Sequence, residues 1–96
     1  MKDLAEIKNT LSKHKTVLEE KYRVKRIGIF GSYARGVPME ESDSDILVDL
    51  YEPIGWNLIE LKEFLESILE INVDLVTVKA LKPQLNDIIL NEVVFT

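Results

Sequence analysis

Two short segments decide the fold of this chain: Phe-Gly-Ser-Tyr-Ala-Arg-Gly at residues 30–36 and Ser-Asp-Ser-Asp-Ile-Leu-Val at residues 42–48. Residues 24–30, which are rich in β-branched side chains, predict a strand, and Gly31 permits the turn from that strand into a short helix. The second segment runs into another strand. Each segment therefore places polar side chains at one end of a predicted strand.

The Gly31-Ser32 turn has the features of a phosphate-binding loop. Gly31 has no Cβ, so the backbone there can approach a ligand closely. Ser32 adds a hydroxyl donor, and the residues that follow open a helix whose free N–H groups favour an anion. The sequence contains no Gly-x-x-x-x-Gly-Lys, so this turn is not a P-loop. Because plain Gly-Ser turns are also common, the loop needs support from a second motif.

Asp43 and Asp45 supply that second motif. They occupy alternate positions at the start of the second strand, so both carboxylates lie on one face, about 6–7 Å apart. Two ionised carboxylates at that distance repel by roughly 2–3 kcal/mol at an effective dielectric of about 20. A cation offsets this repulsion, and Mg²⁺ takes oxygen ligands while keeping positions for substrate phosphates. With no cysteine and His14 as the only imidazole, the sequence predicts a metal site built on oxygen ligands.

A third carboxylate has two candidates. Asp74 lies in an otherwise apolar stretch, where a charge is costly unless it has a partner. Asp49 shares the face of Asp43 and Asp45, but it lies further along the strand and would meet solvent or a basic side chain. The residues alone leave this choice open.

The rest of the chain predicts an α+β fold. The expected elements are a helix over residues 3–21, strands over 24–30, 45–51 and 72–78, a helix over 58–69 capped by Asn57, and a last helix from Pro83. Residues 93–95 extend as a short edge strand or a tail. His14 borders the apolar face of the first helix, where a half-buried, hydrogen-bonded role is expected rather than a catalytic one. We expect residues 1–96 to form a single domain, a small mixed sheet of three to four strands flanked by helices.

Charge is unevenly distributed along the chain. The net charge of −5 divides into +4 over residues 1–26 and −9 over residues 27–96. An acidic body argues against extended nucleic-acid binding, which needs clustered Lys and Arg. No segment has the ~18 consecutive apolar residues of a membrane span, and the N-terminus does not resemble a signal peptide. The expected location is therefore the cytoplasm, without a membrane partner.

The spacing of the motifs resembles a known family. Gly31-Ser32, then the ten residues 33–42, then Asp43-Ser44-Asp45 resemble the signature of the minimal nucleotidyltransferases, which belong to the DNA polymerase beta-like nucleotidyltransferase superfamily. Val73-Asp74-Leu75-Val76 resembles the later strand of that family, which bears the third acid. The resemblance spans nearly the whole chain, and the spaced two-part motif is far more specific than either part alone.

The resemblance implies a fold and a reaction. The fold would be the nucleotidyltransferase fold, and the reaction would be transfer of a nucleotidyl group, usually adenylyl, from a triphosphate such as ATP. Asp43 and Asp45 would bind the Mg²⁺ that bridges the triphosphate, with two ions expected. Asp74 would ligate the second ion or accept the hydroxyl proton as a general base.

The same resemblance implies a nucleotide site. Gly31 and Ser32 would hold the β- and γ-phosphates. Arg35 would reach a phosphate or form a structural salt bridge to an acid of the neighbouring strand. Tyr33 and Trp56 would stack on a base, contact a partner or simply pack.

Many short members of the family are encoded beside a HEPN-domain protein, often an RNase toxin. These MntA-type proteins act as antitoxins in HEPN/MNT toxin–antitoxin pairs, and some adenylylate a tyrosine of the toxin. The resemblance therefore implies a HEPN-type toxin as partner and acceptor. Two other interpretations stay open: a non-catalytic antitoxin that occludes its partner, and an adenylyltransferase that acts on a small-molecule hydroxyl group.

Overall fold

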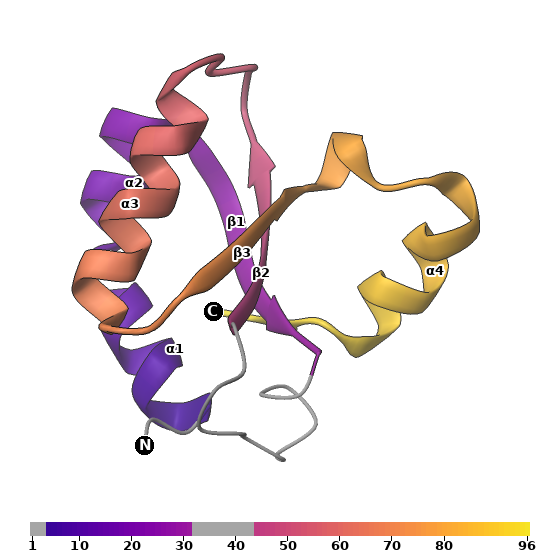
Figure 1. Cartoon of the computed structure of the whole chain (residues 1–96), viewed down its shortest axis with the longest axis horizontal. Coiled ribbons are helices and arrows are strands. Elements are labelled where there is room, and N and C mark those ends of the chain that lie inside the picture. Colours follow the sequence, from indigo (N-terminus) through magenta and orange to yellow (C-terminus); the bar gives the residue numbers. More distant parts are fainter. Residues whose placement is uncertain (1–3, 32–43) are drawn as a thin grey trace.

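The computed structural model describes residues 4–31 and 44–96. Its elements, in chain order (Figure 1), are α1 (Leu4–Lys13), α2 (Lys15–Tyr22), β1 (Val24–Phe30), β2 (Ser44–Leu50), α3 (Asn57–Leu69), β3 (Val73–Thr77), the 3₁₀ helix η1 (Val78–Ala80), α4 (Pro83–Glu92) and β4 (Val94–Phe95).

The four strands form one mixed sheet in the order β3-β2-β1-β4. β1 pairs antiparallel with both β2 and β4, whereas β2 and β3 run parallel. A parallel pair needs a crossover connection, and α3 provides it. The predicted α+β fold with a small mixed sheet is confirmed, and residues 94–95 form the fourth, edge strand.

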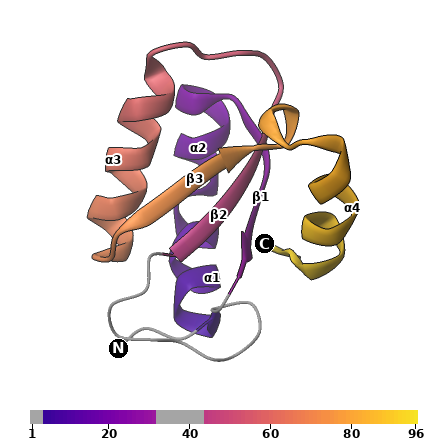
Figure 2. The ribbon, with the colours of Figure 1, turned by 45° about the vertical axis from the view of Figure 1, so that its right-hand side comes forward.

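The helices divide between the two faces of the sheet. Figures 1 and 2 show α1, α2 and α3 together on one face and α4 on the other side. On the first face Ile46 and Val48 of β2 are fully buried against Leu61 and Leu65 of α3, among other core residues. Burying one such side chain contributes about 1.5–3 kcal/mol, so this layer supplies most of the hydrophobic stabilisation.

The predicted first helix is interrupted at His14. The His14 N–H bonds Leu11 O, three residues back, at 3.1 Å, while the ring Nδ1 donates to Thr10 O at 2.9 Å. The side chain thus takes the carbonyl that the backbone N–H would use in a continuous α-helix. The ring also meets Phe64 edge-on with centroids 5.7 Å apart, so the expected half-buried, hydrogen-bonded histidine is confirmed.

Gly28 marks a close contact between β1 and the extended segment that follows α4. A Cβ at Gly28 would lie 2.6 Å from Val93 Cγ2 and 2.9 Å from Phe95 Cδ1. The absence of a side chain at Gly28 therefore allows the segment after α4 to pair with β1.

The ends of other elements differ slightly from the predictions. Trp56, not Asn57, occupies the N-cap position of α3 and makes no side-chain capping bond. The third strand ends at Thr77, because Val78–Ala80 turns into η1. Among the described residues, no helix is long and apolar enough to cross a membrane.

Candidate active site

The parallel pairing of β2 and β3 brings two of the predicted site residues together. Asp45 and Asp74 are direct partners in the register of the two strands. Neighbouring strands lie about 4.8 Å apart, and partners in register project from the same face. Two acids 29 positions apart in the sequence thus share one small area at the start of both strands. An ionised pair about 5 Å apart repels by roughly 3 kcal/mol at an effective dielectric of about 20.

Gly31 lies against this pair. Its φ of +77° is in the left-handed region, which favours glycine. A Cβ built at Gly31 would collide with the Asp45 carboxylate. Two independent constraints therefore require glycine at the turn, and the second is contact with a predicted site residue.

Two hydrogen bonds fix the register that places Asp74. Ser44 N donates to Asn72 O at 2.9 Å, which ties the start of β2 to the residue before β3. Val73 N donates to the Glu66 carboxylate of α3 at 3.0 Å, immediately before Asp74. Because a slip of one residue would turn Asp74 to the opposite face, these bonds determine which way its carboxylate points.

Asp49, the rival acid, lies at the other end of β2. Its Oδ2 accepts hydrogen bonds from Arg26 Nε at 3.3 Å and Nη2 at 3.2 Å. Arg26 also stacks on the Phe95 ring, with the guanidinium carbon 4.5 Å from the centroid. The carboxylate is thus engaged in a structural ion pair with Arg26 at the opposite end of β2 from Asp45.

The expectation that Asp74 is a costly charge in need of a partner is wrong. Asp74 is exposed on the edge strand β3, so it needs no partner to avoid desolvation. No Lys, Arg or His in the described part of the chain forms an ion pair with it. What singles out Asp74 is its register with Asp45, which the sequence pattern alone does not reveal.

The remaining predicted site residues, Ser32, Arg35 and Asp43, and also Tyr33, lie outside the described residues. Within residues 4–31 and 44–96 no group of three or more acidic, His or Cys side chains could hold a metal ion. Asp45 and Asp74 provide carboxylate oxygens, which is the donor type that Mg²⁺ prefers. The predicted third oxygen donor, Asp43, lies two positions before Asp45 and outside the described residues.

The role of Glu66 was not predicted from the sequence, because Glu66 is one of several charged residues on an amphipathic helix. The signal for it is geometric, since its carboxylate reaches the first N–H of another element. Trp56 is 87% exposed, which removes core packing as its role.

Comparison with known proteins identifies relatives of this chain. The model of the nucleotidyltransferase domain family matches residues 11–96. A protein of Methanocaldococcus jannaschii with the provisional name protein adenylyltransferase is 60% identical over 78 residues, 80% of each chain. Protein adenylyltransferase MntA of Thermococcus cleftensis is 47% identical over 96 residues, 99% of this chain and 97% of that one.

Solved structures share the fold. A protein provisionally described as a minimal nucleotidyltransferase superposes with a TM-score of 0.71 at 32% identity, covering 92% of this chain and 93% of that one. A toxin–antitoxin structure with AMP-PNP gives 0.64 at 29% identity, covering 80% and 63%. The Shewanella oneidensis complex of a tri-AMPylated HEPN toxin with MNT antitoxin gives 0.66 at 23% identity, covering 93% and 70%, which shows a common fold.

Proposed function

This chain belongs to the nucleotidyltransferase domain family, and we propose that it transfers AMP from ATP to a hydroxyl group of a protein partner, a tyrosine of a HEPN-type toxin for which it is the antitoxin. The observation that carries the proposal is the register of Asp45 with Asp74 beside the Gly31 turn. Relatives that match most of the chain are named protein adenylyltransferases, which supports AMP as the transferred group.

The donor set fits magnesium. Asp45 and Asp74 from the described strands, with Asp43, would hold Mg²⁺, and two ions suit a three-carboxylate site. Bound Mg²⁺ would neutralise the charge of the triphosphate and that of the acid cluster. Without it the carboxylates and the phosphates repel one another, so we expect nucleotide binding to depend on the ion.

The residues of the chain have separate tasks in the transfer. The Gly31-Ser32 turn would hold the β- and γ-phosphates through backbone N–H groups and the Ser32 hydroxyl, with Arg35 as a further phosphate contact. Asp74, at the exposed edge of the sheet, would take the proton of the acceptor hydroxyl. The acceptor oxygen then attacks the α-phosphorus, and the bond from that phosphorus to the bridging oxygen of the β-phosphate breaks. The products are the AMP ester of the acceptor and pyrophosphate.

Thermal unfolding tests the metal and nucleotide site. Mg²⁺ or Mn²⁺ with ATP should raise Tm, because a ligand that binds only the folded state stabilises it. The double variant Asp43→Asn, Asp45→Asn should lose the shift. An equal shift in the double variant would place the site elsewhere in the chain.

Mass spectrometry tests the transfer. A HEPN-domain protein from the same genome, incubated with the chain, ATP and Mg²⁺, should gain the mass of an adenylyl group on tyrosine. The variant Asp43→Asn should bind this partner and leave it unmodified. Protection from the toxin without a mass change, equal for wild type and Asp43→Asn, would instead establish an antitoxin that acts by occlusion.

A further inference from the structure

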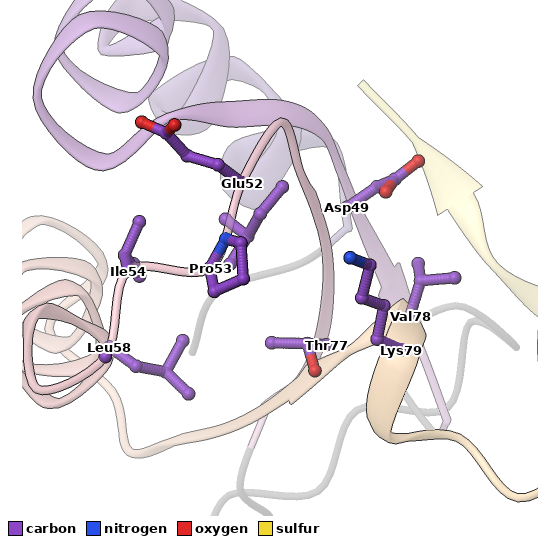
Figure 3. Close-up of a pocket in the computed structure, with 10 residues that line it drawn as sticks. Asp49, Glu52, Pro53, Ile54, Leu58, Thr77, Val78 and Lys79 are labelled. Carbon is purple, nitrogen blue, oxygen red and sulfur yellow. The ribbon is translucent and has the colours of Figure 1, made fainter.

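A cleft of about 250 Å³ opens at the far end of β2 and β3, away from the Asp45–Asp74 pair. Its wall combines the ends of both strands, η1, the loop of residues 51–56 and the first turn of α3. Figure 3 shows the lining side chains. Most of the lining surface is apolar, and the residues with apolar side chains are Leu50, Pro53, Ile54, Leu58 and Val78.

The charges around the cleft are not equivalent. Glu52 pairs with Arg23 at 3.0 Å and Asp49 pairs with Arg26 at 3.2 Å, and Figure 3 shows both carboxylates turned away from the cleft. Lys79, by contrast, turns its ammonium group toward the cleft in Figure 3. In the described part of the chain no carboxylate forms an ion pair with it. The cleft therefore combines an apolar floor with one available positive charge.

The loop beside the cleft exposes two aromatic side chains. Trp56 is 87% exposed and Tyr51 is 56% exposed. Neither belongs to the core, and Trp56 at the N-cap of α3 forms no capping bond, so folding does not explain it. Tryptophan and tyrosine are enriched among the residues that dominate binding energy at protein interfaces.

We propose that this cleft, together with Tyr51 and Trp56 at the two ends of the loop that lines it, is the docking surface for the protein acceptor, separate from the reaction centre. The occupant is a segment of the acceptor that inserts an apolar side chain and places an adjacent Asp or Glu on Lys79. Charge complementarity selects this segment, because the acids of the rim are already neutralised by arginines and only a cation is left to pair. The inference rests on the proposed function, since it requires a protein acceptor.

Four variants measured against the HEPN-domain acceptor test the docking surface. Trp56→Ala and Ile54→Asp should each weaken binding of the acceptor about 10–30-fold, the scale of a buried interface anchor. Lys79→Glu should weaken it about 5–10-fold, with an effect that shrinks as salt is added. The matched control is Ile59→Asp, because Ile59 is also apolar and 55% exposed but lies outside both the cleft lining and the loop of residues 51–56. Its affinity should equal that of wild type.

Kinetics separate docking from chemistry. The cleft variants should raise KM for the acceptor and leave kcat and the Tm shift by Mg²⁺ and ATP unchanged. A photo-cross-linker at position 56 should capture an acceptor peptide that contains an apolar residue next to Asp or Glu. Wild-type affinity in all three cleft variants would overturn the docking surface while the transfer reaction stands. Loss of affinity in these variants without adenylylation by wild type would retain the surface and overturn the proposed reaction.

Discussion

The two ends of the parallel pair β2–β3 carry acidic residues that differ in their charged neighbours. At the start of the strands Asp45 faces Asp74 across the register, and among the described residues no basic side chain pairs with Asp74. At the far end Asp49 is held by Arg26. Asp45 and Asp49 lie on the same face of the same strand, so strand alternation alone does not distinguish them.

The difference shows how a fold assigns roles to chemically identical groups. A carboxylate beside an arginine contributes to structure and is poorly suited to bind a cation. Two carboxylates brought together in strand register, as Asp45 and Asp74 are, repel each other, and a bound cation would offset that repulsion. We therefore propose the Asp45–Asp74 end as the reactive end and the Asp49 end as the surface that binds an apolar partner.

The largest expected effect is on the rate of AMP transfer, when the acid at one end of the strands or the other is replaced by asparagine. Asp74→Asn should lower the rate of AMP transfer by about 10²-fold or more, the scale of a lost general base. Asp49→Asn should stay within a few-fold of wild type, because its ion pair with Arg26 lies outside the site. Single-turnover transfer to the acceptor at saturating ATP measures both. The reverse ranking would move the reaction to the far end of the strands.

Alanine substitutions at Gly31 and Gly55 distinguish backbone strain at a turn from contact with the Asp45 carboxylate. Gly31 and Gly55 both have positive φ, +77° and +55°, so alanine at either position strains the backbone by roughly 1–2 kcal/mol. Only at Gly31 does the new Cβ strike Asp45, since no atom lies within 4 Å of a Cβ at Gly55. Gly31→Ala should therefore also lose about 10-fold or more in transfer rate, as expected for a displaced catalytic group. Equal rates in the two variants, measured on folded protein, would mean that Gly31 serves the turn alone.

Glu66 connects α3 to the reactive end. Glu66→Ala removes the acceptor of the Val73 N–H bond and should lower the transfer rate about 3–10-fold through misplacement of Asp74. Glu66→Gln keeps a carbonyl oxygen at that position and should restore most of the rate. Glu63→Ala is the control, because Glu63 is exposed on the same helix and has no such bond. A rate for Glu66→Gln as low as that for Glu66→Ala would indicate that the charge, not the hydrogen bond, matters.

The smallest effect concerns stability without metal. In the presence of a chelator, Asp45→Asn should be neutral or slightly stabilising, because it relieves repulsion from Asp74. Asp49→Asn should cost up to about 1 kcal/mol, since it weakens a partly exposed ion pair. Urea unfolding resolves the two. A loss of several kcal/mol for Asp45→Asn would show that this residue is structural.

The sequence predicted most elements because their patterns are local. β-Branched side chains marked β1, side-chain alternation marked β2, and Pro83 marked the first residue of α4. The break at His14 was missed, because a side chain that competes for a backbone carbonyl leaves the apolar spacing intact. The pairing of Asp45 with Asp74 followed from family resemblance, not from residue patterns, since strand register depends on the whole sheet. The cleft was missed for the same reason, as its wall comes from β2, β3, η1, α3 and the loop of residues 51–56.

The short connection between α3 and β3 constrains the number of residues that can lie between Glu66 and Asp74. Glu70 ends α3 with a positive φ of +57°, and β3 begins three residues later at Val73. One inserted residue there would either break the bonds of Val73 and Asn72 or slip β3 and turn Asp74 toward the core. The loop of residues 51–56 has no such constraint, because α3 and its bonds lie between that loop and Asp74. Active members of the family should therefore vary in length at the loop that corresponds to residues 51–56. They should keep a constant number of residues between the positions that correspond to Glu66 and Asp74.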